Sequence, residues 1–493
     1  METAHLSDEE KLRLIWEVVE KELTAHRQDM CAQLKKLIPI KSIYDPSGTH
    51  AAELEEAAAA CARLLRENDS DPSVRVIDMP DSPPDVKHPP LVYAHWPSDK
   101  PNAPTLLLYA HYDVVQATDE EFEPGENNGR ITGRGSADDK SGIMMHVALC
   151  RALRTLRRSN LSVGVNIKLV LEGEEESGTD TLEKYVEAHP EMFRADVISL
   201  ADAGNIAVGN PTLTTSLRGV LVADVEVRTL AKEVHSGVFG GPAPDAFMAL
   251  TRILARLHDD DGNVAVPGLV GGQWQGTQPE TTAFRENATV LDGVRLIGTG
   301  SLGSRLYTKP SISVVALDGP GRRTNYRNVL QAGATARVSV RLSPFENPQN
   351  AFTRLREHLQ RPDLNPWGAI VEVTRVATAT GFFAKTGTRG FRLAEWALNK
   401  IFPDKPVNHA GQGASIPPAS SLQKLFPEAA ILVWGCEEPS ANIHARNESV
   451  DIGEMYAMTR AQALLTVLMG LWTGATVPPP RVEETLAPAM PIS

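Results

Sequence analysis

The sequence is poor in cysteine and in long apolar runs. Its 493 residues contain only four cysteines, none of them in a Cys-x-x-Cys pair: Cys31, Cys61, Cys150 and Cys436. This excludes a disulfide-rich scaffold and a zinc site built from cysteines. We expect reduced thiols in a cytoplasmic protein. The first residues show no basic segment followed by an apolar run, so we expect no signal peptide.

Positive charge is also scarce. Lys and Arg number 49 against 62 Asp and Glu, which gives a formal net charge of −13. Binding nucleic acid through its phosphates needs a basic face, and binding anionic lipid needs a basic patch, so we expect neither a nucleic acid nor a membrane as partner. The most apolar stretch, residues 461–472, is interrupted by Gln462 and Thr466. It is shorter than the ~20 residues of a membrane-spanning helix and predicts a buried helix.

What the chain does contain is an alternation of apolar strands and helical runs. Its length predicts two or three domains. Strand-like runs at 105–110, 165–171, 197–200 and 429–434 alternate with helical runs at 143–156, 181–189, 391–401 and 455–472. Apolar strands separated by helices are typical of an α/β protein with a mostly parallel sheet. Ser7 and Glu10 form a capping-box pattern that predicts an opening helix, and residues 51–68 predict a second.

The middle of the chain has a different pattern of polar and apolar residues. Residues 221–228 and 334–342 alternate polar and apolar side chains, as antiparallel strands with one wet face do. With helices at 246–257 and 352–359 they predict a ferredoxin-like α+β domain in β-α-β-β-α-β order. We therefore expect one discontinuous α/β domain, residues 1–213 and 391–493 with a Pro-rich tail, interrupted by a smaller domain at residues 214–390.

Histidine and carboxylate side chains follow several of the predicted buried strands. His111 ends the first strand with Asp113 two residues later, and Asp138 and Asp139 open a helix after a glycine-rich segment. In open α/β sheets, sites lie outside the carboxyl ends of the strands. Taken singly, such residues are more often surface groups or helix caps.

Three more segments repeat the pattern. Glu174, Glu175 and Glu176 follow strand 165–171, Asp202 follows strand 197–200, and His444 lies in a polar loop after strand 429–434. Two histidines and three or four carboxylates can hold two divalent ions, and this mixture suits zinc as well as manganese or cobalt. One of the successive glutamates could bind metal while its neighbour accepts protons from water.

The order of these motifs resembles the co-catalytic metallopeptidase family that includes carnosinase, cytosolic nonspecific dipeptidase, aminoacylase and glutamate carboxypeptidase. The likeness covers residues 30–470, from His-x-Asp through Gly-Arg-Gly-x-x-Asp-Asp-Lys and Glu-Glu-x-Gly to the late histidine. In the insert, Leu-Arg-Gly at 217–219 and His-Ser-Gly-Val-Phe-Gly-Gly at 235–241 look most like the dipeptidase and carnosinase branch.

The resemblance implies a role for each site residue. His111, Asp138 and Asp202 would hold one ion, and Asp138, Glu176 and His444 the other, with the peptide after the bridging Asp138 in cis. Glu175 would be the general base, and Asp113 would orient His111. The insert would be a lid and dimerisation domain, so we expect a homodimer. Three of its residues would meet the substrate: His235, reaching the site of the partner subunit, and Asn328 and Arg341, which hold the substrate carboxylate.

One loop departs from the family pattern. Residues 413–417, which include Ser415, resemble the Gly-Gly-Ser-Ile-Pro loop of dipeptidases, but Gly411 and Gln412 stand where those enzymes have Arg-Glu. The resemblance thus implies metal-dependent hydrolysis of an amide bond in dipeptides or similar small substrates with a free carboxylate. An N-acyl-amino-acid amidohydrolase is the alternative. A non-catalytic binding protein of the same fold would be expected to have a damaged ligand set, whereas every position here is filled.

Overall fold

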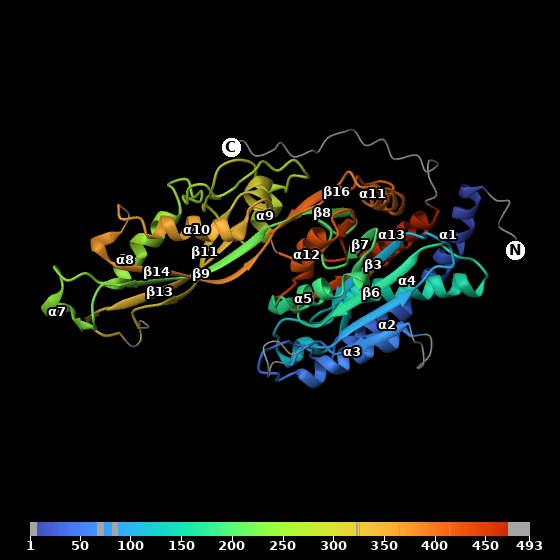
Figure 1. Cartoon of the computed structure of the whole chain (residues 1–493), viewed down its shortest axis with the longest axis horizontal. Coiled ribbons are helices and arrows are strands. Elements are labelled where there is room, and N and C mark those ends of the chain that lie inside the picture. Colours follow the sequence, from blue (N-terminus) through green and yellow to red (C-terminus); the bar gives the residue numbers. More distant parts are fainter. Residues whose placement is uncertain are drawn as a thin grey trace. The chain divides into compact units, whose positions relative to one another are not determined.

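The computed structural model describes residues 7–66, 73–80, 87–321, 324, 326–363, 365–413 and 415–471. They form two compact units (Figure 1). Among the described residues, the first unit takes those up to 215, 384–410 and those from 416 onward, and the second takes 216–383 and 411–415. The Pro-rich tail expected at the end of the chain lies outside the described residues.

The first unit is built on a mixed sheet whose centre is parallel. Its strands lie in the order β1 (Val74–Ile77), β2 (Leu91–Trp96), β6 (Asn166–Glu172), β3 (Thr105–His111), β7 (Val197–Leu200), β17 (Ala430–Val433) and β8 (Thr212–Leu217). The neighbours β6, β3, β7 and β17 are parallel, whereas β1, β2 and β8 pair antiparallel. Every residue of β7 and β17 is buried, as expected for central strands covered on both faces.

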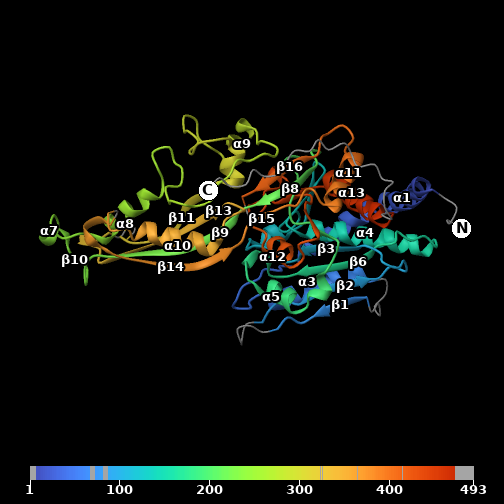
Figure 2. The ribbon, with the colours of Figure 1, turned by 45° about the horizontal axis from the view of Figure 1, so that its top comes forward.

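Helices cover both faces of this sheet. The chain moves from β3 through α4 (Lys140–Arg158) to β6, and then back through α5 (Thr181–Ala188) to β7. Because both crossovers are right-handed, the reversal places α4 and α5 on opposite faces. Other helices pack on these two: α1 (Asp8–Ala25), α2 (Arg27–Leu37), α3 (Ala51–Leu65) and α13 (Ile452–Gly470) on α4, and α12 (Pro417–Leu425) on α5. The helix α11 (Arg389–Ile401) packs against α13, beside which it lies in Figure 2, and it also contacts β17.

Several helix predictions are confirmed, with different boundaries. The Ser7–Glu10 capping box is present at the start of α1. The helix predicted at 51–68 ends at Leu65, and residues 67–72 lie outside the described part of the chain. Residues 461–470 are buried in α13, as predicted. No helix in the described part of the chain is both long enough and apolar enough to cross a lipid bilayer.

The second unit has the predicted antiparallel sheet. Its strands lie in the order β11 (Ser311–Asp318), β13 (Gly333–Leu342), β9 (Gly219–Arg228) and β14 (Ile370–Ala379), every pair antiparallel. The helices α8 (Ala246–Leu254) and α10 (Pro348–Leu359) pack on it. Inward-facing residues of β9 and β13 form the core with these helices. With strands β9, β11, β13 and β14 counted first to fourth, the order 2-3-1-4 is that of a ferredoxin-like fold, as predicted from the sequence.

Short elements complete the two units. In the first, β4 (Gly125–Asn127), β5 (Arg130–Thr132) and β18 (Ser449–Asp451) form a small sheet. In the second, β10 (Val234–His235) pairs with β12 (Val329–Leu330) beside α7 (Ser236–Phe239), and α9 (Thr281–Asn287) lies in the connection before β11. The strand β16 (Asn408–Gln412) pairs with β8, and β15 (Phe382–Phe383) pairs with the last residues of β8.

Candidate metal centre

The polar residues of the first unit gather at the carboxyl ends of its four parallel strands. His111 is the last residue of β3, and Glu174–Glu176 follow β6. Asp202 follows β7 by two residues, and the loop with His444 follows β17. Since β6, β3, β7 and β17 are neighbours, their ends meet at one edge of the sheet. This is where an open α/β sheet binds its ligands.

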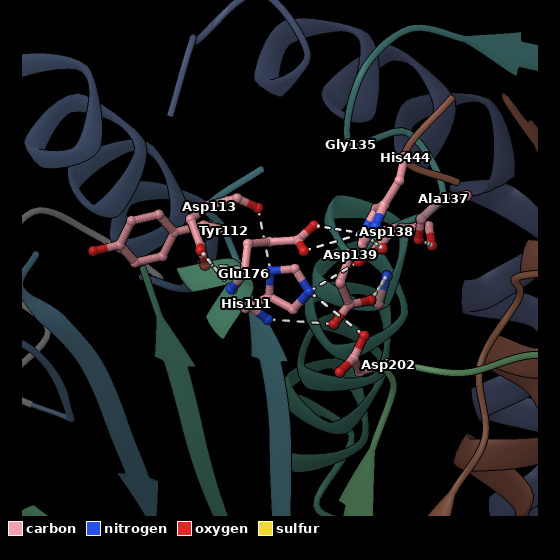
Figure 3. A network of polar contacts seen from close by, with 12 residues as sticks. His111, Tyr112, Asp113, Gly135, Ala137, Asp138, Asp139, Glu176, Asp202 and His444 are labelled. Carbon is pink, nitrogen blue, oxygen red and sulfur yellow. Dashed lines mark hydrogen bonds and ion pairs between the residues drawn. The ribbon is translucent and has the colours of Figure 1, made fainter. Parts of the chain in front are cut away.

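Asp138 lies between the two histidines. One of its carboxylate oxygens is 3.0 Å from His111 Nε2, and the other is 3.0 Å from His444 Nε2 (Figure 3). Asp202 Oδ1 lies 3.5 Å from His111 Nε2, and Glu176 Oε2 lies 3.0 Å from His444 Nε2. The five residues predicted as metal ligands are therefore brought together, in two groups that share Asp138.

The three successive glutamates have three different environments. Glu174 is buried, and its Oε2 lies 2.9 Å from Nδ1 of the buried His88. Glu176 lies against His444. Glu175 is half-buried between them, and its carboxylate makes no hydrogen bond or ion pair within the part of the chain that the structure describes. The sequence alone could not separate these three residues, because their partners come from distant segments.

Asp113 connects the two groups of ligands through hydrogen bonds. Its Oδ1 is 3.3 Å from His111 Nδ1, and its backbone carbonyl oxygen is 3.2 Å from the same nitrogen. Its other carboxylate oxygen accepts a hydrogen bond of 3.0 Å from the backbone N–H of Glu176. Asp113 is completely buried. This position suits a residue that fixes the orientation of a metal-ligating imidazole.

A buried glutamate that the sequence analysis did not single out holds the Asp138 loop. Glu448 accepts hydrogen bonds from the backbone N–H groups of Gly135, Ala137 and Asp138 at 3.0–3.2 Å. Arg134 donates to the same carboxylate at 2.8 Å. The pairing of β5 with β18 places Glu448 beside this loop, because Ser449 pairs with Thr132.

Asp139, the second acid of the Asp-Asp pair, caps the N-terminus of a helix. The peptide between Asp138 and Asp139 is cis, as the family resemblance implied. Asp139 is the N-cap of α4, and its carboxylate accepts hydrogen bonds from the N–H groups of Gly142 and His111 at 3.2 and 3.3 Å. Both of its oxygens therefore have backbone partners, although it lies close enough to His111 and Asp202 to contribute a ligand atom.

The centre holds more negative charge than its own residues can balance. Burial raises the pKa of Glu176 to about 7, with His444 acting in the opposite direction, and burial also raises the pKa of Asp202. Hydrogen bonds with Asp138 and Glu176 raise the pKa of His444 to about 10. Within the described residues, neither Asp138, Asp202 nor Glu176 has a lysine or arginine ion-pair partner. Divalent cations would supply the missing positive charge, so the donor set fits a metal centre.

The other predicted site residues lie in the second unit and form two groups. His235 ends β10, is exposed, and lies next to Asn328, whose carbonyl oxygen accepts a hydrogen bond from Ser236 N–H at 2.9 Å. Arg341 is half-buried near the end of β13, and the Oγ of Ser415 donates to the Arg218 carbonyl oxygen at 2.6 Å.

The two groups are far apart within this unit. His235 pairs with Val329, before β13 begins at Gly333, whereas Arg341 lies eight residues into that strand. At about 3.3 Å per residue, the strand alone separates Gly333 from Arg341 by about 26 Å.

Arg218 is a second cation beside Arg341 that the sequence analysis noted only as part of a motif. It is 8% exposed, donates to Ser311 Oγ at 3.0 Å, and has no hydrogen-bond partner at Nε within the described chain. Burial lowers its pKa to about 10, and the nearby charge of Arg341 adds to this effect. In the described part of the chain, neither arginine has a carboxylate partner. Two cations without a counterion suit an anionic ligand.

The departure at Gly411 has a steric explanation. A Cβ atom on Gly411 would lie 2.4–2.7 Å from the Tyr307 side chain, so this ring occupies the space that a side chain at position 411 would need. A Cβ atom on Gly413 would likewise lie 2.9 Å from Arg218 Nη2. An arginine at position 411 would therefore require the Tyr307 ring to move, and the Arg218 guanidinium lies close to the same loop.

The chain belongs to peptidase family M20/M25/M40, whose model matches residues 107–467. The cysteinylglycine-S-conjugate dipeptidase of Corynebacterium striatum is 35% identical over 459 residues, which cover 90% of this chain and 96% of that relative. The β-Ala-His dipeptidase of Homo sapiens is 24% identical over 465 residues, which cover 86% of this chain and 87% of the relative. These relatives confirm the predicted resemblance to the dipeptidase and carnosinase branch.

Solved structures show the same fold. The crystal structure of human carnosine dipeptidase 1 matches with a TM-score of 0.76 and 23% identity, covering 93% of this chain and 99% of that one. The dipeptidase Dug1p from Saccharomyces cerevisiae matches with a TM-score of 0.76 and 19% identity, covering 92% and 98%. The predicted α/β architecture with an inserted α+β domain is confirmed.

Proposed function

We propose that this protein is a metal-dependent dipeptidase, which hydrolyses the peptide bond of dipeptides or similar small substrates with a free carboxylate. The observation that carries the proposal is the arrangement of His111 and His444 on either side of Asp138, with two further carboxylates beside them. The relatives with this family's fold are named as dipeptidases, which supports the same reaction type here.

The proposed centre holds two divalent ions, most simply Zn²⁺, with Mn²⁺ or Co²⁺ as alternatives. His111, Asp138 and Asp202 would bind one ion, and Asp138, Glu176 and His444 the other. When bound, such ions lower the pKa of a water molecule and polarise the carbonyl group of the substrate. Asp113 holds the His111 ring in place for this purpose.

Glu175 is the proposed general base. Glu174 is engaged with His88 and Glu176 with His444, so Glu175 is the one member of the triplet whose carboxylate has no bonding partner in the described chain. It would take a proton from the attacking water and deliver it to the nitrogen of the leaving amine. Burial raises the pKa of Glu175 well above its usual value, and the charge of Asp202 adds to this effect. A raised pKa suits a group that both accepts and releases a proton near neutral pH.

Arg341 and Ser415 are the proposed contacts of the substrate carboxylate within one chain, and Asn328, which lies beside His235, would reach the same carboxylate from the partner subunit. A planar guanidinium can form two parallel N–H···O bonds with a carboxylate. Arg341 has no acidic partner among the described residues that would compete for it. The pair of cations formed with Arg218 strengthens the preference for an anionic end group.

His235 is proposed to stabilise the oxyanion in the site of a partner subunit. Its distance from Arg341 along the second unit argues that one chain does not bring both residues to the same substrate. The proposed homodimer would form through the second unit. Its edge strand β11 exposes three apolar side chains, Val314, Val315 and Leu317, and an apolar, unpaired edge strand is suited to association.

An N-acyl-amino-acid amidohydrolase is the second candidate, because the Tyr307 ring occupies the place of the arginine expected at position 411. An aromatic wall there favours an acyl group or a large side chain. Both candidates share the metal chemistry and the amino acid that leaves as the amine, and they differ only in the group on the carbonyl side of the bond, which is an aminoacyl group or another acyl group.

A substrate panel tests both proposals. Metal-free protein should be inactive, and Zn²⁺, Mn²⁺ or Co²⁺ should restore hydrolysis of dipeptides such as β-Ala-His, Cys-Gly and its S-conjugates. Preference for N-acetyl amino acids would favour the second candidate. Full activity of protein shown by elemental analysis to be metal-free would overturn the mechanism.

The same panel tests the role of Arg341. Arg341→Lys should lose activity on free acids, with little change on the corresponding amides, which the wild type should already hydrolyse poorly. Arg337→Lys is the matched control, because Arg337 lies on the same strand, is exposed and is paired with Asp224. Equal wild-type activity on acids and amides, unchanged in the Arg341 variant, would remove Arg341 from the site.

A further inference from the structure

Glu437 is a buried acid at the metal centre to which the family resemblance assigns no role. It follows β17 by four residues, at the same edge of the sheet as the other ligands. It is only 7% exposed, and its buried Oε1 atom has no hydrogen-bond partner among the described residues. A buried carboxylate oxygen without a partner is costly, because folding has removed its water without replacing it.

The backbone on both sides fixes the position of Glu437. Its carbonyl oxygen accepts a hydrogen bond of 2.8 Å from Asn205 N–H, and its own N–H lies 3.4 Å from the carbonyl oxygen of Ala203. This contact requires two glycines. A Cβ atom on Gly204 would lie 1.5 Å from the Glu437 carbonyl oxygen, and one on Gly435 would lie 2.3 Å from the carbonyl oxygen of Ala203. The strand ends are therefore packed closely enough to hold Glu437 beside the loop that carries Asp202.

The side chain of Glu437 lies toward the metal ligands. One oxygen from each of Asp138, Asp202 and Glu437 can be chosen so that all three lie within 4.8 Å of one another. Three acids at such distances repel one another unless a cation lies between them. The adjacent Glu438 is equally buried, at 8% exposed, but its carboxylate has partners: it pairs with Arg130 at 2.5 Å and accepts a hydrogen bond from Ser440 N–H at 2.7 Å.

We propose that Glu437 is an additional ligand of the ion held by His111, Asp138 and Asp202. The inference rests on the proposed function, since it assumes the two-ion centre described there. With Glu437, one ion has a histidine and three carboxylates, whereas the other has a histidine and two carboxylates. The two positions are then unequal. The first is richer in oxygen donors and negative charge, which favours higher coordination numbers.

Titration of metal-free protein with Co²⁺ tests this assignment, because Co²⁺ reports affinity and coordination through its visible absorption. The wild type should bind two Co²⁺ ions per chain. Glu437→Gln and Glu437→Ala should weaken one of the two by about 10–100-fold, as the loss of a group supporting a metal site typically does. The absorption of that ion should change in shape, while the other ion keeps its affinity and spectrum. Glu438→Gln is the control and should leave both ions unchanged.

Thermal unfolding of the metal-free proteins separates ligation from a structural role. If Glu437 is a metal ligand without a structural role, replacing it should leave the unfolding temperature of the metal-free protein unchanged or raise it. A lower unfolding temperature for both metal-free variants would make Glu437 a structural group and overturn the proposal.

Two outcomes of the titration distinguish this proposal from the proposed function. If both Glu437 variants bind two Co²⁺ ions with wild-type affinities and spectra, only the role of Glu437 is refuted. A wild-type protein that binds no Co²⁺ would refute the two-ion centre itself, and with it both proposals.

Discussion

The substitution Glu175→Gln is the sharpest test of the proposed reaction. The glutamine side chain has nearly the same shape as glutamate but cannot accept a proton from water. The Glu175 carboxylate has no hydrogen bond or ion pair among the described residues, so the change breaks no contact seen in the structure. The variant should therefore fold and bind metal as the wild type does.

The size of the effect follows from the role of a general base. Such a group contributes about 10²–10⁴-fold to the rate. At about 1.36 kcal/mol per tenfold change, this corresponds to roughly 2.7–5.4 kcal/mol of transition-state stabilisation. The loss should appear in kcat, with KM nearly unchanged, because the base acts on the water and not on the bound substrate.

The assay measures kcat and KM of the Zn²⁺-loaded variant together with its metal content. Glu187→Gln is the matched control, because Glu187 is an exposed acid on the nearby helix α5 and should leave both quantities unchanged. Near-normal kcat with two bound ions would show that another group takes the proton. A variant that loses an ion would show that Glu175 is a ligand instead.

Two further predictions concern assembly and pH. Mixing the inactive His235→Ala and Glu175→Gln variants should restore some activity, because one site of a hybrid dimer has both groups intact. If subunit exchange is confirmed and no activity returns, His235 acts in the site of its own chain or in no site. In metal-free protein the pKa of His444 is about 10, raised by two carboxylates, so an ion must displace its proton at neutral pH. Affinity for Zn²⁺ should therefore rise between pH 6 and pH 9, by up to about tenfold per unit for each proton displaced. A flat profile in calorimetric titrations would contradict that pKa.

The sequence predicted the parts of the centre that local pattern defines. His111 and Asp202 follow apolar strands, and the position of those strands was clear from their composition. Glu437 shows the same signal, because it too follows a buried strand, but Glu438 beside it is equally acidic. Only the tertiary structure shows that Glu438 is paired with Arg130 while Glu437 is not.

The boundaries of helices and the contacts between distant segments could not be predicted from local sequence patterns. The helix α2 was not predicted, since only His26 separates it from α1 and no glycine or proline marks the break. The role of Glu448 depends on the pairing of β18 with β5, which are more than 300 residues apart in sequence. The steric need for Gly411 depends on Tyr307, and no periodicity in the sequence relates the two.

The hydrogen bonds between Glu448 and the Asp138 loop have a consequence for the order in which the site is assembled during synthesis. The two residues are 310 positions apart. Ribosomes add about 5–20 residues per second, so roughly 15–60 s pass between the synthesis of Asp138 and that of its partner. By the time β17, Glu437 and His444 are made, β3, β6, β7 and the strands β9–β14 of the second unit have already been synthesised. The strands of the inserted unit are thus made first, and the full set of metal ligands exists only after His444 has been made.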